Sequence, residues 1–123
     1  MKRVAILGAS NKKTRYSRMA QELLTEKGYE VVPISRGGDD ILGVKSYQRV
    51  GEIPGKIDTL TVYLSPKHLA EHVDDIVRSD IRRVIFNPGT ENEPLRKKIE
   101  ESGKFVLEAC SIVLLKTGQF DKS

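Results

Sequence analysis

Short apolar runs alternate along this chain with longer amphipathic stretches. Five runs have the composition of β-strands, and they cover residues 4–7, 30–34, 59–63, 84–86 and 105–107. Four of them are continuous apolar blocks rather than alternations of apolar and polar residues. Continuous blocks are typical of strands in a parallel sheet, because helices cover both faces of such a sheet. We therefore expect a five-stranded parallel sheet.

The segments between the runs have helical periodicity. Apolar residues at 19, 20, 23 and 24 share one face of a predicted helix that ends at Gly28. A second helix begins with Ser65 as N-cap and Pro66 at its first position. A third covers residues 93–101, with Thr90 or Asn92 as its cap. Between residues 36 and 57, glycines leave room only for a short helix near residues 47–53.

The alternation of strands and helices predicts a doubly wound α/β domain with three layers, a parallel sheet between two layers of helices. We expect the strand order 3-2-1-4-5. In such sheets ligands bind beyond the carboxyl ends of the strands, where the strand order reverses. This places the expected site at the switch between strands one and four.

Composition narrows the class of protein and the kind of partner. A chain of 123 residues is long enough for one compact domain, which we expect to cover residues 1–123. No apolar run approaches the length that spans a bilayer, and none forms the core of a signal peptide, so we expect a cytoplasmic protein and no membrane partner. The net charge of +4 favours an anionic partner. Nucleic acid is disfavoured, because basic residues are scattered among acidic ones.

The loop after the first strand has the features of an anion site. Gly8 permits a tight turn, and Ala9 and Ser10 are small. The cations Lys12, Lys13 and Arg15 precede a helix N-terminus, whose unpaired N–H groups attract phosphate. The loop lacks the later glycines of the G-x-G-x-x-G pattern, so a turn that serves packing alone remains an alternative.

The end of the second strand favours a phosphorylated ribose. Sites for NAD usually carry Asp or Glu at this point, to bind the ribose hydroxyls. This chain instead has Ser35 and Arg36, and a guanidinium suits a ribose that carries an additional phosphate. NADP and coenzyme A (CoA) both contain that group. An exposed loop arginine without a ligand is the alternative interpretation.

Motifs over nearly the whole chain resemble those of a known family. They are GAS at residues 8–10, RYS at 15–17, GYEV at 28–31, LGVKSY at 42–47, NPGTEN at 87–92 and EAC at 108–110. In their order and spacing they look like the small stand-alone CoA-binding proteins. These share the Rossmann-like CoA-binding domain of the succinyl-CoA synthetase alpha subunit.

The resemblance implies a CoA site across the carboxyl ends of the strands. The pyrophosphate would lie at residues 8–17, the adenosine near residues 35–36 and 65–66, and the pantetheine arm towards residues 87–90. The backbone amides of this last loop and the side chain of Asn87 are expected to hydrogen-bond the amide-rich arm, and a strand-to-helix turn with a purely structural role is the alternative. The candidate ligand-binding residues are Gly8, Ala9, Ser10, Lys13, Arg15, Tyr16, Ser17, Ser35, Arg36, Leu64, Ser65, Pro66, His68, Asn87, Pro88, Gly89 and Thr90.

Residues with catalytic chemistry are few. His68 and His72 have a spacing compatible with a metal, but no further ligand motif accompanies them. Cys110 has no evident base beside it, and neither a nucleophile elbow nor a phosphate-binding GK[ST] loop is present. We therefore expect neither catalytic residues nor a bound metal, and a protein that is not an enzyme.

The sequence leaves three functions to compare. The preferred one is non-catalytic binding of CoA or an acyl-CoA, as a carrier, a sensor or a subunit of an assembly. The alternatives are a small NADP-dependent reductase and an interaction module without a ligand. The partner is expected to be a small-molecule nucleotide. The oligomeric state stays open, with a homodimer as one alternative.

Overall fold

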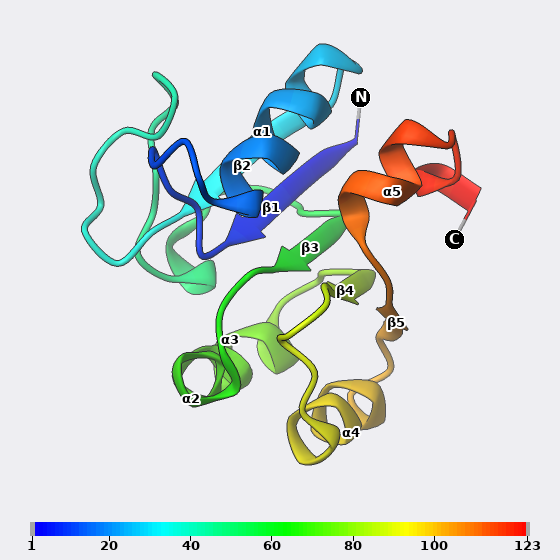
Figure 1. The fold of residues 1–123 in the computed structure, drawn as a ribbon. Helices are drawn as coiled ribbons and strands as arrows, with labels where there is room; N and C mark the ends of the chain where they lie inside the picture. Colours follow the sequence, from blue (N-terminus) through cyan, green and yellow to red (C-terminus); the bar gives the residue numbers. More distant parts are fainter. Residues whose placement is uncertain (1, 123) are drawn as a thin grey trace.

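All five predicted strands form, and they lie in one parallel sheet (Figure 1). The structure is a computed structural model that describes residues 2–122. The strands are β1 (Arg3–Leu7), β2 (Glu30–Ile34), β3 (Thr59–Val62), β4 (Arg83–Phe86) and β5 (Phe105–Glu108). The expected fold class, a Rossmann-like α/β sheet, is confirmed.

Within this class, one strand lies in a different place from the expected one. The order is β2-β1-β3-β4-β5, so β3 pairs with β1 and not with β2. The outer edge of β2 is already occupied by the segment at Tyr47, which exchanges hydrogen bonds with the backbone of Pro33 and Ser35 at 3.0 and 2.8 Å. The β3 strand pairs instead with the other side of β1. The switch point therefore lies between β1 and β3.

Helices cover both faces of the sheet and give the three expected layers. They are α1 (Tyr16–Glu26), α2 (Pro66–Leu69), α3 (Val73–Arg78), α4 (Glu93–Glu101) and α5 (Ser111–Lys116), with 3-10 helices η1 (Val50–Glu52), η2 (Ala70–His72) and η3 (Phe120–Lys122). α1 packs beside α5, and α3 packs beside α4 (Figure 1). On β1, Val4 and Ile6 belong to one apolar core and Ala5 and Leu7 to the other. Burial on both faces explains the continuous apolar runs within β1, β2 and β4.

Several helices differ in detail from the expected ones. The helix after Ser65 is divided, because η2 separates α2 from α3. Asn92 caps α4, since its Oδ1 accepts a hydrogen bond from the N–H of Leu95 at 3.1 Å. The helices α5 and η3 were not expected, because segments of six and three residues are too short to show helical periodicity. Within residues 2–122, no helix is both long and apolar enough to cross a membrane.

The buried side chain of Arg83 links the C-terminal segment at Phe120 to the sheet. Arg83 on β4 is almost fully buried, and its Nε donates a hydrogen bond to Thr59 Oγ1 at 3.0 Å. Its Nη1 donates to the carbonyl of Phe120 at 2.6 Å, and its guanidinium lies 4.6 Å from the centroid of the Phe120 ring. A buried charge needs such partners. The contacts therefore place η3 against the sheet.

Candidate functional site

The loops that follow β1, β2 and β3 meet at the switch point. Gly8 has a φ of +94°, and a Cβ there would lie 3.0 Å from Leu64 Cδ2 and 3.1 Å from the carbonyl of Tyr63. The N–H groups of Gly8 and Ala9 both donate to the carbonyl oxygen of Ile34, at 3.1 and 3.0 Å. Only glycine fits this conformation and this spacing without displacing backbone. The sequence-based assignment of a tight turn to Gly8 therefore has a specific physical cause.

A crevice of about 580 Å³ opens between these loops. It is lined by Gly8, Ala9, Ser10, Lys12, Thr14, Arg15, Tyr16, Ser17, Ser35, Arg36, Tyr63, Leu64, Ser65, Pro88, Gly89 and Thr90. Most of the candidate residues come together here, drawn from the loops after β1, β2, β3 and β4. The candidates outside the crevice lining are Lys13, Pro66, His68 and Asn87.

The N-terminus of α1 lines the crevice. The helix begins at Tyr16 after Arg15, whose side chain makes no capping hydrogen bond. The first N–H groups of a helix have no partners within the helix, and its dipole adds partial positive charge there. Lys12, Arg15 and Arg36 also line the crevice, and no carboxylate of the described residues does. The arrangement favours a bound anion.

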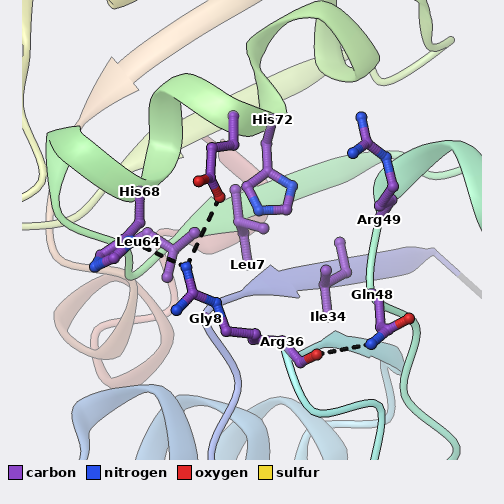
Figure 2. A pocket seen from close by; sticks show the side chains of 10 residues that line it. Leu7, Gly8, Ile34, Arg36, Gln48, Arg49, Leu64, His68 and His72 are labelled. Carbon is purple, nitrogen blue, oxygen red and sulfur yellow. Dashed lines mark hydrogen bonds and ion pairs between the residues drawn. The ribbon is translucent and has the colours of Figure 1, made fainter.

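A second cavity, of about 250 Å³, adjoins the crevice (Figure 2). Gly8, Arg36 and Leu64 line both, so the two spaces are adjacent. The other lining residues of this second cavity are Leu7, Ile34, Gln48, Arg49, His68, Glu71 and His72. Its buried apolar side chains come from the ends of β1 and β2, and its polar ones from the segment before η1 and from α2 and η2. A flat apolar group with polar edges suits such a lining.

Arg36 lies at the junction of the two spaces. Its backbone is held, since Gln48 Nε2 donates to the Arg36 carbonyl at 2.8 Å. Its guanidinium is exposed and lies 3.4 Å from His68 Nδ1 and 3.9 Å from Glu71 Oε2 (Figure 2). Exposed ion pairs of this length contribute little stability. The guanidinium can therefore turn towards a ligand at low cost.

His72 contributes a neutral ring to the second cavity. Burial lowers the pKa of His72, and the nearby Arg49 guanidinium lowers it further. Within the described part of the chain, the buried Nδ1 of His72 has no hydrogen-bond partner. Arg49 is held at 3.1 Å by Asp75, whose pKa is lowered mainly by that hydrogen bond. The ring of His72 is therefore uncharged at neutral pH.

Asn87 has a different role from the expected one. Its Nδ2 donates to Thr61 Oγ1 at 2.7 Å and to the carbonyl of Val62 at 2.9 Å. Its Oδ1 accepts from the N–H of Ser111 at 2.8 Å. The side chain is buried and joins β3 to the start of α5. We therefore correct the expectation that the Asn87 amide binds the pantetheine arm, since its donors are already engaged within the fold.

The sequence did not single out several residues of the site. Thr14, Tyr63, Gln48, Arg49 and Glu71 line one of the two spaces but were not candidates. Tyr63 follows β3 directly, so its place at the carboxyl edge was a usable signal. The residues before η1 lie at the cavity because Tyr47 pairs with β2. No local sequence pattern predicts that pairing. Across residues 2–122, no group of three or more His, Cys, Asp or Glu side chains could hold a metal ion.

The fold and the site define a Rossmann-like α/β domain with a crevice lined by cationic side chains at the switch point of its sheet. The chain belongs to the CoA binding domain family, whose sequence model matches residues 2–116.

Relatives with known sequences or structures agree with this assignment. The uncharacterized protein YneT of Bacillus subtilis is 29% identical over 106 residues, which is 86% of this chain and 78% of YneT. The acetate–CoA ligase (ADP-forming) II subunit alpha of Pyrococcus furiosus is 29% identical over 85 residues, which is 68% of this chain and 18% of the subunit. A crystal structure of an uncharacterized protein has a TM-score of 0.89 at 37% identity and covers 98% of both chains.

Proposed function

We propose that this protein binds CoA or an acyl-CoA without transforming it, as a carrier, a sensor or a subunit of a larger assembly. The observation that carries the proposal is that the two spaces lie side by side and that Arg36 lines both. An apolar cavity for a base, a guanidinium for a ribose phosphate and a helix N-terminus for a pyrophosphate follow one another in the order of the groups in CoA.

The proposed pose begins in the second cavity. The adenine packs on Leu7, Ile34 and Leu64, and the 3′-phosphate of the ribose meets Arg36. The pyrophosphate lies at the N–H groups of Tyr16 and Ser17, where the dipole of α1 favours negative charge. The pantetheine arm continues towards residues 88–90, which line the other side of the crevice.

The family match favours CoA over NADP as the ligand. A role in binding rather than in catalysis is supported by the chemistry of the crevice. Within the described residues its lining contains neither a carboxylate nor an imidazole. Its ionisable side chains are the cations Lys12, Arg15 and Arg36 and the phenols Tyr16 and Tyr63, which can donate hydrogen bonds to phosphate oxygens. The P. furiosus ligase subunit is much longer than the segment this chain matches. A CoA-binding module that serves a larger assembly fits that relation.

Calorimetric titration with CoA tests the proposal, and Ser65 offers a matched pair of variants. Ser65 precedes α2, lines the crevice and makes no capping hydrogen bond through its side chain. Asp and Asn are both good N-cap residues and have nearly the same shape, so both variants should fold. Ser65→Asp places a carboxylate in the crevice proposed to hold the CoA phosphates, and we expect the affinity for CoA to fall at least about tenfold. Ser65→Asn should stay within about threefold of the wild type.

Titration of the wild-type protein tests whether CoA is the ligand. Saturable heat with CoA, and weaker heat with NADP, supports the proposed ligand. If the wild-type protein gives no saturable heat with CoA or acetyl-CoA, the proposed function is wrong. If Ser65→Asp and Ser65→Asn bind CoA equally well, the ligand does not lie in this crevice.

A further inference from the structure

A strained turn lies beside the crevice, in the connection between β2 and η1. Ile41 and Val44 exchange two backbone hydrogen bonds of 2.9 Å, which close a two-residue turn through Leu42 and Gly43. Both central residues have positive φ, +50° at Leu42 and +78° at Gly43. Turns of this kind usually carry Asn or Asp at the first position, and leucine rarely adopts positive φ. An outside contact is needed to account for this conformation.

Asn11 provides that contact from the loop after β1. Its Oδ1 accepts a hydrogen bond from the N–H of Leu42 at 2.8 Å, and its Nδ2 donates to the carbonyl of Asp40 at 2.9 Å. The amide thus holds the turn at two points, on both sides of Ile41. The carbonyl of Asn11 in turn accepts a hydrogen bond from Arg18 Nη1 at 2.6 Å, which ties the same residue to α1.

These contacts join the segment of residues 39–46 to the loop that lines the crevice. At its start, the loop after β1 is held by the N–H groups of Gly8 and Ala9, which donate to the Ile34 carbonyl. Further along, Ser10 Oγ accepts from the N–H of Lys12 at 3.1 Å, and Arg15 N–H donates to the Lys12 carbonyl at 3.0 Å. Its residues 11–15 are exposed, so packing does not fix their conformation. The hydrogen bonds of Asn11 with Asp40 and Leu42, called the clamp below, therefore contribute strongly to fixing the conformation of this loop.

We propose that Asn11 is a positioning residue for the ligand, one that clamps the loop of residues 8–15 to the turn at Leu42 and so preorganises the phosphate end of the crevice. This inference rests on the proposed function, since the ligand is the CoA pyrophosphate at the start of α1. Asn11 acts through the backbone of its loop and is not itself a contact of the ligand. Preorganisation raises affinity by reducing the ordering that binding would otherwise require.

Two readouts on Asn11→Ala test the clamp. In the protein without ligand, amide hydrogen exchange at Lys12 and Arg15 should accelerate about tenfold, because both N–H groups are bonded within the loop that the clamp holds. In the same variant, the affinity for CoA should fall about tenfold.

Ser46→Ala is the matched control. Ser46 Oγ donates to the Asp39 carbonyl at 2.6 Å, so its removal loosens the same 39–46 segment without touching Asn11. We expect Ser46→Ala to leave exchange at Lys12 and Arg15 unchanged and the affinity for CoA within about threefold of the wild type. A role of Asn11 in general stability alone would make the two variants alike.

The outcomes separate this inference from the proposed function. If Asn11→Ala leaves exchange at Lys12 and Arg15 unchanged, or if Ser46→Ala lowers affinity as much, the clamp is wrong even though CoA binds. If exchange accelerates while the affinity for CoA is unchanged, Asn11 holds the loop but does not position the ligand, and the proposal is also overturned. Absence of CoA binding to the wild type contradicts the proposed function, and with it the positioning role, whatever the exchange result.

Discussion

Arg36 is the residue at which the chemistry of the ligand can be tested most narrowly. Its guanidinium is exposed and has only loose contacts with His68 and Glu71. A hydrogen bond between charged groups contributes about 1.5–3 kcal/mol, so Arg36→Ala should weaken CoA about 10- to 150-fold. Dephospho-CoA lacks the 3′-phosphate and should lose little affinity. Calorimetry with both ligands measures the difference.

The control for this variant is Arg78→Ala. Arg78 is an exposed arginine at the end of α3, and it lines neither the crevice nor the second cavity. Arg78→Ala removes the same charge as Arg36→Ala, so any long-range effect of net charge on affinity appears in both variants. Equal losses for CoA and dephospho-CoA in Arg36→Ala would show that Arg36 does not bind the ribose phosphate.

Gly8 permits a second test at the residue scale, on stability. Gly103 has the same φ of +94° as Gly8, but a Cβ at Gly103 would meet nothing within 4 Å. Gly103→Ala should therefore cost only the conformational penalty, about 1–2 kcal/mol. Gly8→Ala should cost about 1–3 kcal/mol more, because its Cβ would press on the backbone of Tyr63. Urea unfolding of both variants compares them, and equal costs would mean that the close approach of the two loops is absent.

The residues that the sequence placed correctly differ physically from those it did not. Gly8 and Arg36 were candidates because of properties that belong to one residue, a permitted backbone angle and a charge, and both line the crevice after a recognisable strand. The role of Asn87 depends on Thr61, Val62 and Ser111, which reach it from β3 and α5. No sequence pattern shows which partners will surround a buried amide. An asparagine in a loop at the carboxyl edge suggested a ligand contact. The partners of Asn87 instead give its side chain a structural role between β3 and α5.

Among the elements, the edge of β2 shows why the strand order was misplaced. The sequence indicated five parallel strands and their lengths, since burial on both faces leaves a continuous apolar run. It did not show that the backbone at Tyr47 would pair with β2. That pairing involves one residue, and its hydrogen bonds come from backbone groups that every residue has. This pairing nevertheless occupies the carboxyl end of the outer edge of β2, and β3 pairs with β1.

The C-terminal elements provide a prediction at this scale. Phe120 in η3 is buried against Arg83 of β4 and lies edge-on to the ring of Tyr29, with 5.3 Å between the ring centroids. Phe120→Ala should lower the free energy of unfolding by about 3–5 kcal/mol, the usual cost of removing a buried phenylalanine ring. Val113→Ala on α5 is the control, because Val113 is exposed and should change stability by no more than about 0.5 kcal/mol. Similar effects in thermal or urea unfolding would show that η3 does not pack on the sheet.

At the scale of the whole molecule, the site exists because a parallel sheet brings distant loops to one edge. The crevice combines residues 8–17, 35–36, 63–65 and 88–90, which are separated along the chain by entire strands and helices. Only the relative order of β1 and β3 places the first and third of these loops face to face. The expectation of a site at the carboxyl edge holds for either strand order. The loops that face each other across it depend on the observed one.

The central claim is that CoA lies along this edge, from the second cavity past Arg36 to the start of α1. Titration of ¹⁵N-labelled protein with CoA, followed by amide chemical shifts, tests it most directly. We expect the largest changes at residues 9–17, 35–36, 64–65 and 89–90, with saturation. Changes concentrated at the opposite edge of the sheet, around Lys2, Lys56 and Asp80, would contradict the claim, as would amides at the carboxyl edge that do not move at saturating CoA.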